Sequence, residues 1–299
     1  MAVARKILPA IAITVGDPAG IGPEVVAKTL RDPRLPKGFR FEVLGKSTGP
    51  GLRPGRLTKT SARVALHALE EAALGCREGR FAAMVTGPVH KHALSRLQPD
   101  FVGQTEFLAR ACGFSDDAAV MALTDPKLTV ALCTNHCSLT DAIHRLTPER
   151  IIQVTKITHQ FLQQRGIAKP RLAVAGINPH EGENGLFGDE DALLILPAWA
   201  ELARQGINLT RGPADTIFYQ AVQKKAFDAV ICAYHDQGLI PFKLVAFATG
   251  VNVTLGLPII RTSPDHGTAI EIAGQNKADH RSMLAAVQLA CQLSKGRKT

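Results

Sequence analysis

Three histidines lie just beyond predicted strands, where they could bind a divalent metal ion. They are His136, His180 and His235, in the segments CTNH, NPHEGE and YHDQG. Neutral imidazole suits borderline divalent cations, and three imidazoles leave coordination positions open for substrate oxygens. Each histidine alone is more often a hydrogen-bonded structural residue. Because all three occupy equivalent sheet-edge positions, we expect their side chains to converge on one metal site.

A second set of polar residues could bind an anionic substrate. Gln104 and Thr105 stand at a predicted helix start, where a hydroxyl serves either as a helix cap or as a phosphate ligand. Lys243, Asn252 and Arg261 follow on later elements and offer two cations and an amide to carboxylate and phosphate oxygens. The alternative for the two cations is a solvated surface position.

Two turns containing glycine and proline follow early predicted strands. The segment GDPAGIGPE, residues 16–24, opens a predicted helix and could present backbone N–H groups to an anion. It is neither a G-x-G-x-x-G fingerprint nor a P-loop with its lysine, so a tight turn that packs helix on strand is an equally good interpretation. The segment TGPVHK, residues 86–91, places a hydroxyl, a cation and a histidine at a strand end.

The elements that would position these residues indicate an α/β fold, because short β-branched runs alternate with longer amphipathic stretches. Strands are predicted at residues 11–15, 41–44, 82–86, 118–123, 128–134, 171–175, 229–234, 251–255 and 259–262. Helices are predicted at residues 25–30, 64–74, 148–162 and 283–293. Residues 46–60 are predicted to be a surface connection, and no linker marks a domain boundary.

Composition excludes several classes of protein. A net charge of +9 would suit an anionic partner, but the basic residues are scattered and aromatic residues make up only 5%, which argues against nucleic acid. No apolar run reaches the roughly 20 residues of a membrane span, and residues 1–20 lack a signal peptide pattern. We therefore expect no membrane association.

The six cysteines are irregularly spaced in a chain too long to need disulfides, which favours a cytoplasmic location. Cys133 and Cys137 flank His136, but their spacing without a second cysteine pair is poor evidence for structural zinc.

Together these motifs resemble the 4-hydroxythreonine-4-phosphate dehydrogenase family of vitamin B6 biosynthesis. The matching segments run from about residue 11 to 280 and include GDPAGIGPE, TGPVHK, GQTEF, NPHEGENGLFGDE, PADT, YHDQGLIPFK and NVTLGLPIIRTSPDHGTAIEIAG. The resemblance implies a fold like that of isocitrate and isopropylmalate dehydrogenases. Residues 1–299 would form one dehydrogenase unit of two intertwined α/β lobes, with the active site in the cleft between them.

The resemblance also implies a homodimer with active sites at the subunit interface and oxidation, then decarboxylation, of 4-phosphohydroxy-L-threonine to 3-amino-2-oxopropyl phosphate. The cofactors would be NAD or NADP and one divalent metal, zinc first, with cobalt, magnesium, manganese or nickel as alternatives. The implied residues are metal ligands His136, His180 and His235, substrate contacts Gln104, Thr105, Lys243, Asn252 and Arg261, proton-transfer groups Asp215 and Lys243, and cofactor contacts Asp265, His266, Gly267, Thr268 and Ala269.

Two departures leave the substrate open. The family commonly has histidine where this chain has Gln104, and residues 46–60 stand where relatives usually carry a longer segment. Related enzymes oxidise threonate or erythronate phosphates or dihydrodiols of aromatic dicarboxylates. A phosphate acyltransferase of related architecture is a further alternative, and the histidine trio argues against it.

Overall fold

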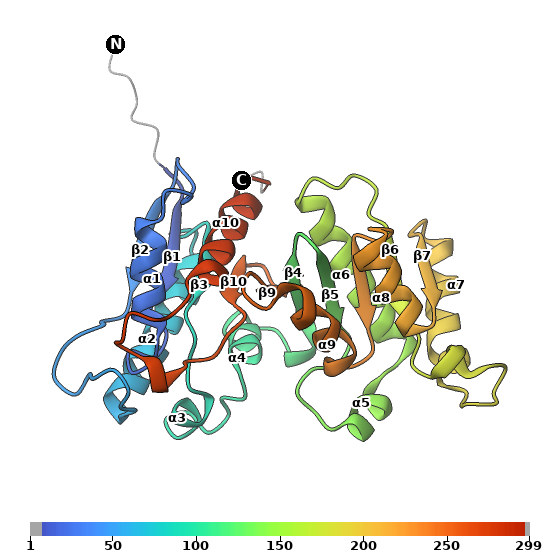
Figure 1. The fold of residues 1–299 in the computed structure, drawn as a ribbon, viewed down its shortest axis with the longest axis horizontal. Coiled ribbons are helices and arrows are strands. Elements are labelled where there is room, and N and C mark those ends of the chain that lie inside the picture. The colour runs from blue at the N-terminus through green and yellow to red at the C-terminus, as the bar shows by residue number, and fades with distance from the viewer. Residues whose placement is uncertain (1–7, 297–299) are drawn as a thin grey trace, which may run out of the picture. The chain divides into compact units, whose positions relative to one another are not determined.

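The first and the last segments that the structure describes belong to the same one of two units. The structure is a computed structural model and describes residues 8–296 (Figure 1). Among these, unit 1 holds residues 8–119 and 257–296, and unit 2 is Val120–Gly256. The segment assessed for a signal peptide begins with residues 1–7, which lie outside the described residues.

Unit 1 contains a parallel sheet in the order β2-β1-β3-β10. Its strands are β1 (Ala10–Thr14), β2 (Arg40–Leu44), β3 (Ala83–Thr86) and β10 (Arg261–Pro264). Its helices are α1 (Gly22–Arg31), α2 (Lys59–Arg77), α3 (Lys91–Ser95), α4 (Gln104–Ala111) and α10 (Arg281–Gly296), with short helices Asp116–Ala118 and Ile270–Ile272. Fully buried Phe81, Leu94 and Leu108 belong to the core between sheet and helices.

Unit 2 contains a mixed sheet in the order β9-β4-β5-β8-β6-β7. The strands are β4 (Val120–Asp125), β5 (Leu128–Leu132), β6 (Leu172–Ala175), β7 (Leu209–Gly212), β8 (Ala229–Cys232) and β9 (Val251–Leu255). Strand β4 is antiparallel to both neighbours, whereas β5, β8, β6 and β7 are parallel. The helices are α5 (Leu139–Arg145), α6 (Pro148–Gln164), α7 (Leu196–Arg204), α8 (Ala214–Gln223) and α9 (His235–Ala246), with short turns Pro179–Gly182 and Asp191–Ile195.

The predicted strands and helices are confirmed, with shifted bounds in places. Strand β4 begins two residues later than predicted, and β10 covers Arg261–Pro264 rather than residues 259–262. Strand β7 was not predicted, because its sequence LTRG lacks an apolar alternation. Helix α6 begins with Thr147 as cap and Pro148 in the first turn, as predicted. Among the helices of residues 8–296, none combines the length and hydropathy that a membrane crossing requires.

The GDPAGIGPE and TGPVHK segments pack against each other in unit 1. The Asp17 N–H donates to the Pro88 carbonyl at 2.9 Å, and the Gly87 N–H donates to the Thr14 hydroxyl at 3.0 Å. Gly16 has a φ of +71°, and a Cβ added there would lie 2.3 Å from the Pro88 carbonyl oxygen. A tight packing turn therefore accounts for the glycine at this position.

Gly16→Ala should destabilise the protein more than Gly79→Ala. Both glycines have positive φ, but nothing lies within 4 Å of a Cβ added at Gly79. The left-handed backbone alone costs about 1–2 kcal/mol, and collision with a backbone carbonyl adds about 1–3 kcal/mol for Gly16→Ala only. Urea unfolding of both variants measures the difference. Equal losses would show that the turn yields without cost.

Candidate functional site

His136 and His235 face a common cavity in unit 2 because they follow neighbouring parallel strands. Strands β5 and β8 pair in register, and the Cys133 N–H donates to the Cys232 carbonyl at 2.8 Å just beyond them. The two imidazole centroids are 5.4 Å apart. The cavity has a volume of about 480 Å³ and is lined by Asn135, His136, Cys137, Ser138, Leu139, Ala142, Tyr234, His235 and Asp236.

This histidine pair fits a divalent cation. Imidazole nitrogens lie about 2.1 Å from zinc, so two rings on one tetrahedral ion have centroids about 5 Å apart. The Asp236 carboxylate lies 2.7 Å from His235 Nδ1. A carboxylate on one ring nitrogen orients the imidazole and directs the other nitrogen to a metal.

His180 does not join this pair within one chain. It follows β6 in the turn Pro179–Gly182, and its ring centroid lies 6.5 Å from that of Phe187. Within residues 8–296, no three His, Cys, Asp or Glu side chains lie close enough together to hold a metal ion. The structure thus brings His136 and His235 together and places His180 elsewhere in the same chain, although β5, β8 and β6 are parallel neighbours as predicted. The three-histidine metal site stays a prediction.

The loop that carries His180 has an unusual backbone. His180, Glu181, Glu183 and Asn184 all have positive φ, between 44° and 57°. Such conformations cost about 1–2 kcal/mol per residue in non-glycine positions and persist only where the surroundings enforce them.

Hydrogen bonds at its base and one ion pair hold this loop in place. The buried Asp191 carboxylate accepts the N–H groups of Ile177 and Asn178 at 2.8 and 2.9 Å. Arg211 pairs with Glu181 at 2.6 Å. Asp191 was not predicted from the sequence, although it is an acidic residue directly after the NPHEGENGLFGDE segment.

Gln237 joins the ends of the strands that carry His235 and His180. Its buried side-chain amide accepts the Ala233 N–H and donates to the Gly176 carbonyl, both at 2.7 Å. The residue stands in the YHDQG segment, but nothing in the sequence shows that it bridges β8 and β6.

Two buried cysteines lie at the ends of the strands that carry His136 and His235. Burial raises the pKa of Cys133 to about 12, and burial also raises the pKa of Cys232 well above its usual range. Both side chains are therefore protonated core thiols at neutral pH.

Arg261 and Gln104 meet in unit 1. The Arg261 side chain is only 3% exposed, and burial lowers its pKa to about 10, with Glu106 opposing the shift, so the guanidinium stays charged at neutral pH. Thr86 accepts hydrogen bonds from Arg261 Nε at 3.0 Å and Nη2 at 2.8 Å. Gln104 accepts from Nη2 at 3.3 Å and donates to the Gly87 carbonyl at 3.2 Å. Thr86, which the sequence analysis did not assign, thus holds the guanidinium.

The other predicted contacts lie in both units. Thr105 is buried in the first turn of α4 in unit 1. In unit 2, Lys243 Nζ lies 5.4 Å from the Phe247 ring centroid, and Asn252 sits on β9 opposite Leu123. Asp215 is exposed in the first turn of α8, where it accepts the Thr216 N–H. Neither Asp215 nor Lys243 is among the described residues that line the histidine cavity.

The predicted cofactor segment packs on the GDPAGIGPE turn. The Thr268 carbonyl accepts the Ile21 N–H at 2.9 Å. His266 Nδ1 lies 3.0 Å from the Gly267 carbonyl oxygen, so Nδ1 carries the hydrogen, and Nε2 is a buried acceptor without a partner among the described residues. An unpaired acceptor on this loop fits a bound group that carries an N–H or O–H donor.

Thr86→Val should lower the free energy of unfolding by about 1–3 kcal/mol, because it leaves buried N–H groups of a charged guanidinium without an acceptor. Thr86→Ser keeps the oxygen and should recover most of the loss. Urea unfolding measures both variants, and equal stability of Thr86→Val and wild type would contradict this role.

Comparison with known proteins shows which family this chain resembles. The family model for the pyridoxal phosphate biosynthetic protein PdxA matches residues 25–290. A protein of Geobacter metallireducens named 4-hydroxythreonine-4-phosphate dehydrogenase is 42% identical, with 96% of each chain covered.

Solved structures show the same fold. That of 4-hydroxythreonine-4-phosphate dehydrogenase from Klebsiella pneumoniae superposes with a TM-score of 0.81 at 35% identity, covering 96% of this chain and 99% of the other. A terephthalate 1,2-cis-dihydrodiol dehydrogenase from Burkholderia xenovorans gives 0.68 at 25% identity, covering 95% and 98%. A β-decarboxylating dehydrogenase from Thermococcus kodakarensis, at 16% identity, shares the fold with a TM-score of 0.58, covering 96% and 82%. The predicted fold class is confirmed, and the chain belongs to the family of the pyridoxal phosphate biosynthetic protein PdxA.

Proposed function

We propose that this protein is a metal-dependent, nicotinamide-linked dehydrogenase that converts 4-phosphohydroxy-L-threonine and NAD to 3-amino-2-oxopropyl phosphate, CO₂ and NADH. The observation that carries the proposal is the pairing of His136 with His235 at the edge of a parallel sheet in a chain of this family. Its near full-length relatives, named 4-hydroxythreonine-4-phosphate dehydrogenase, support the substrate.

His136 and His235 would hold the cation, with Asp236 fixing the ring of His235. A bound divalent cation supplies Lewis-acid polarisation of the substrate hydroxyl, and later of the keto oxygen. Zinc suits the imidazole donors best, with cobalt, nickel, manganese or magnesium as alternatives.

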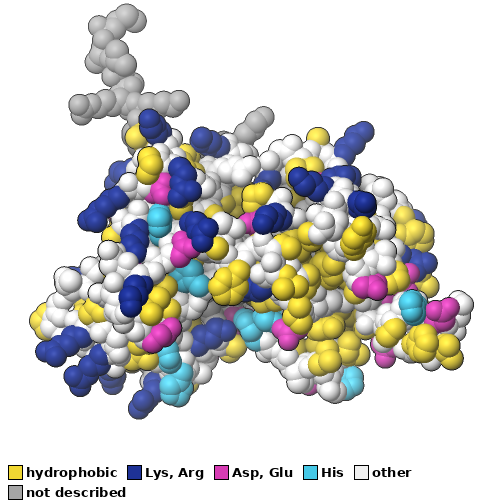
Figure 2. All heavy atoms as spheres, in the orientation of Figure 1, with side chains coloured by type: hydrophobic (Ala, Val, Ile, Leu, Met, Phe, Trp, Pro, Cys, Tyr) yellow, Lys and Arg dark blue, Asp and Glu magenta, His cyan; other side chains and the backbone are white. Residues whose placement is uncertain are grey.

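The third ligand, His180, would come from a second copy of the chain. A strained loop that presents a histidine away from the pair is consistent with this arrangement. An apolar stripe supports dimerisation: Ile240 and Leu244 of α9 and Phe247, directly after this helix, are 61%, 82% and 77% exposed. Figure 2 shows hydrophobic side chains gathered over α9 on the face in view.

Arg261 would bind the phosphate or carboxylate of the substrate. Its guanidinium is buried, and hydrogen bonds to the Thr86 hydroxyl and the Gln104 amide limit the orientation of the guanidinium. Because Gln104 is already bonded to Arg261 and Gly87, we assign it mainly to holding the guanidinium. Thr105, Lys243 and Asn252 would complete the anion contacts, and Lys243 and Asp215 are the candidates for proton transfer.

The order of reaction follows from the substrate. Oxidation of the hydroxyl transfers a hydride to NAD, releases a proton and gives a β-keto acid. The bond between the α-carbon and the carboxylate then breaks, CO₂ leaves, and the β-carbonyl accepts the electron pair as an enolate. A proton taken up at the α-carbon completes 3-amino-2-oxopropyl phosphate. Residues 265–269, with the buried His266 acceptor, would contact NAD or NADP.

A substrate panel tests this proposal. NADH formation measured by absorbance should be highest with 4-phosphohydroxy-L-threonine, and lower with threonate or erythronate phosphate and with terephthalate dihydrodiol.

A substitution tests the metal ligand. His235→Ala should lose its bound zinc, and its turnover should fall by at least about 100-fold. Residues that only orient a metal ligand already contribute up to about 100-fold, and a direct ligand should contribute no less. His67→Ala, on the exposed face of α2, serves as control. Preferred oxidation of another substrate would overturn the substrate assignment, and unchanged zinc content would overturn the ligand assignment.

A mixing experiment tests the shared site. His136→Ala and His180→Ala should each be inactive alone. Mixed after reversible dissociation, they should regain about a quarter of wild-type turnover, because half of the dimers are mixed and each has one intact site. No recovery, despite mixed dimers detected by mass spectrometry, would mean that His180 acts in its own chain. Full turnover of His180→Ala alone would mean that His180 has no part in the site.

A further inference from the structure

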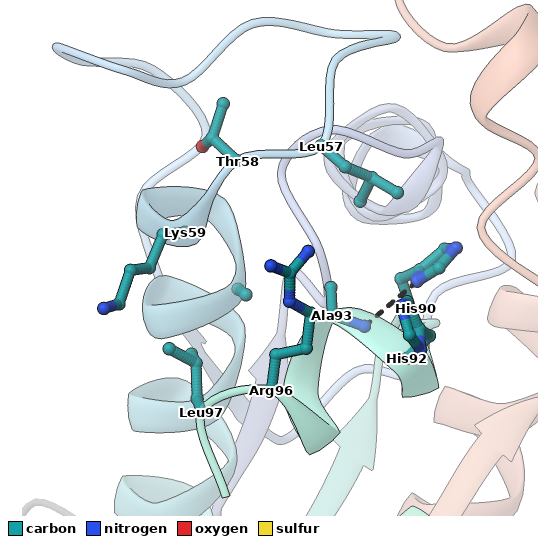
Figure 3. Close-up of a pocket in the computed structure, with 9 residues that line it drawn as sticks. Leu57, Thr58, Lys59, His90, His92, Ala93, Arg96 and Leu97 are labelled. Atoms are coloured by element: carbon teal, nitrogen blue, oxygen red, sulfur yellow. Dashed lines mark hydrogen bonds between the residues drawn. The ribbon is translucent and has the colours of Figure 1, made fainter.

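Unit 1 contains a cavity that none of the assigned substrate, metal or cofactor residues lines. It has a volume of about 330 Å³ and lies between the start of α2 and α3. Figure 3 shows Arg96 extending between the first turn of α2 on one side and His90 and His92 on the other. Hydrogen bonds fix the backbone at the start of α2, which forms one edge of the cavity. The Thr58 hydroxyl accepts the Ser61 N–H, and the Ser61 hydroxyl accepts the Thr58 N–H.

The polar lining of this cavity is cationic or neutral. Lys59, Arg96, His90 and His92 contribute side chains, and no acidic residue is among those that line it. The chain has no Asp or Glu from residue 43 to 69 or from 79 to 99. The local potential is therefore positive, which favours an anion.

The cations in this cavity are not neutralised by the protein. Arg34, Arg80 and Arg110 in the same unit pair with carboxylates. By contrast, the side chains of Lys59, His92 and Arg96 form neither an ion pair nor a hydrogen bond with another residue of the described chain. His90 Nδ1 accepts the Ala93 N–H at 3.2 Å, so its Nε2 carries a hydrogen and is a donor.

The remaining lining is apolar. Leu57, Ala62, Ala93 and Leu97 contribute to the walls, and Ala62 is almost fully buried. A hydrated inorganic ion would leave these walls uncovered, whereas a ligand with an apolar body would cover them and place its charge beside Arg96.

The wall formed by Leu57 and Thr58 belongs to residues 46–60. The alignment with the Geobacter metallireducens relative spans 329 positions, more than the 299 residues of this chain, so that relative has additional residues.

We propose that this cavity is a second ligand site, which binds a small molecule carrying a phosphate monoester on an apolar group. Arg96 and Lys59 bind the phosphate, and Leu57 and Leu97 contact the apolar group. The proposal is independent of the proposed dehydrogenase activity, because binding is measured without turnover.

Isothermal titration calorimetry with phenyl phosphate tests the proposal on the full chain. Wild type should bind phenyl phosphate at least about tenfold more tightly than inorganic phosphate or phenol, each of which offers one half of the recognition. Arg96→Gln combined with Lys59→Gln should weaken binding at least about tenfold, because the charged hydrogen bonds to the phosphate are lost. Arg63→Gln, which removes an exposed cation of α2 outside the cavity lining, should leave the affinity unchanged.

Two outcomes would overturn the proposal. One is equal affinity in wild type and the Arg96→Gln, Lys59→Gln variant, with thermal melting confirming that both are folded. The other is loss of phenyl phosphate binding in Arg261→Gln, which would place the ligand in the substrate site instead. Binding retained in Arg261→Gln and lost in the double variant supports a separate site.

Discussion

The parallel pairing of β5, β8 and β6 is the constraint on which the proposed metal site depends. It brings the carboxyl ends of three strands to one edge, where His136, His235 and His180 follow. Parallel strands are buried on both faces, so polar side chains find room only at their ends. Gln237 secures this edge, because its one buried amide bonds to the backbone at the ends of both β8 and β6.

The three histidines differ in their surroundings at this edge of the sheet. His136 and His235 meet across adjacent strand ends, and a carboxylate orients one ring. His180 stands on a loop whose left-handed backbone is held at its base by Asp191. Contacts within the chain hold this strained backbone, and the proposed sharing of His180 with a second copy gives the strain a use.

Unit 1 buries the charged guanidinium of Arg261. Burial of Arg261 is tolerated because Thr86 and Gln104 supply oxygen acceptors to its N–H groups. The Gln104 amide does not titrate, so its hydrogen bond to Arg261 persists across the physiological pH range. Lys59 and Arg96 differ from the buried Arg261, because they are exposed and line a cavity with apolar walls.

The sequence alone determined the alternation of strands and helices and the residues that follow each strand, because local periodicity and turn residues encode them. It also determined the family, since the segments from GDPAGIGPE to the SPDHGTAIEIAG loop stand in order along the chain. Strand β7 escaped prediction because its polar residues pair by tertiary context rather than by pattern. Only the tertiary structure decided that His136 and His235 pair within one chain while His180 does not. It also decided that Thr86 holds Arg261 in unit 1 and that Asp191 and Gln237 hold the strand ends and the loop of unit 2. Strand order and buried hydrogen bonds arise from contacts between residues far apart in sequence, and no local spacing records them.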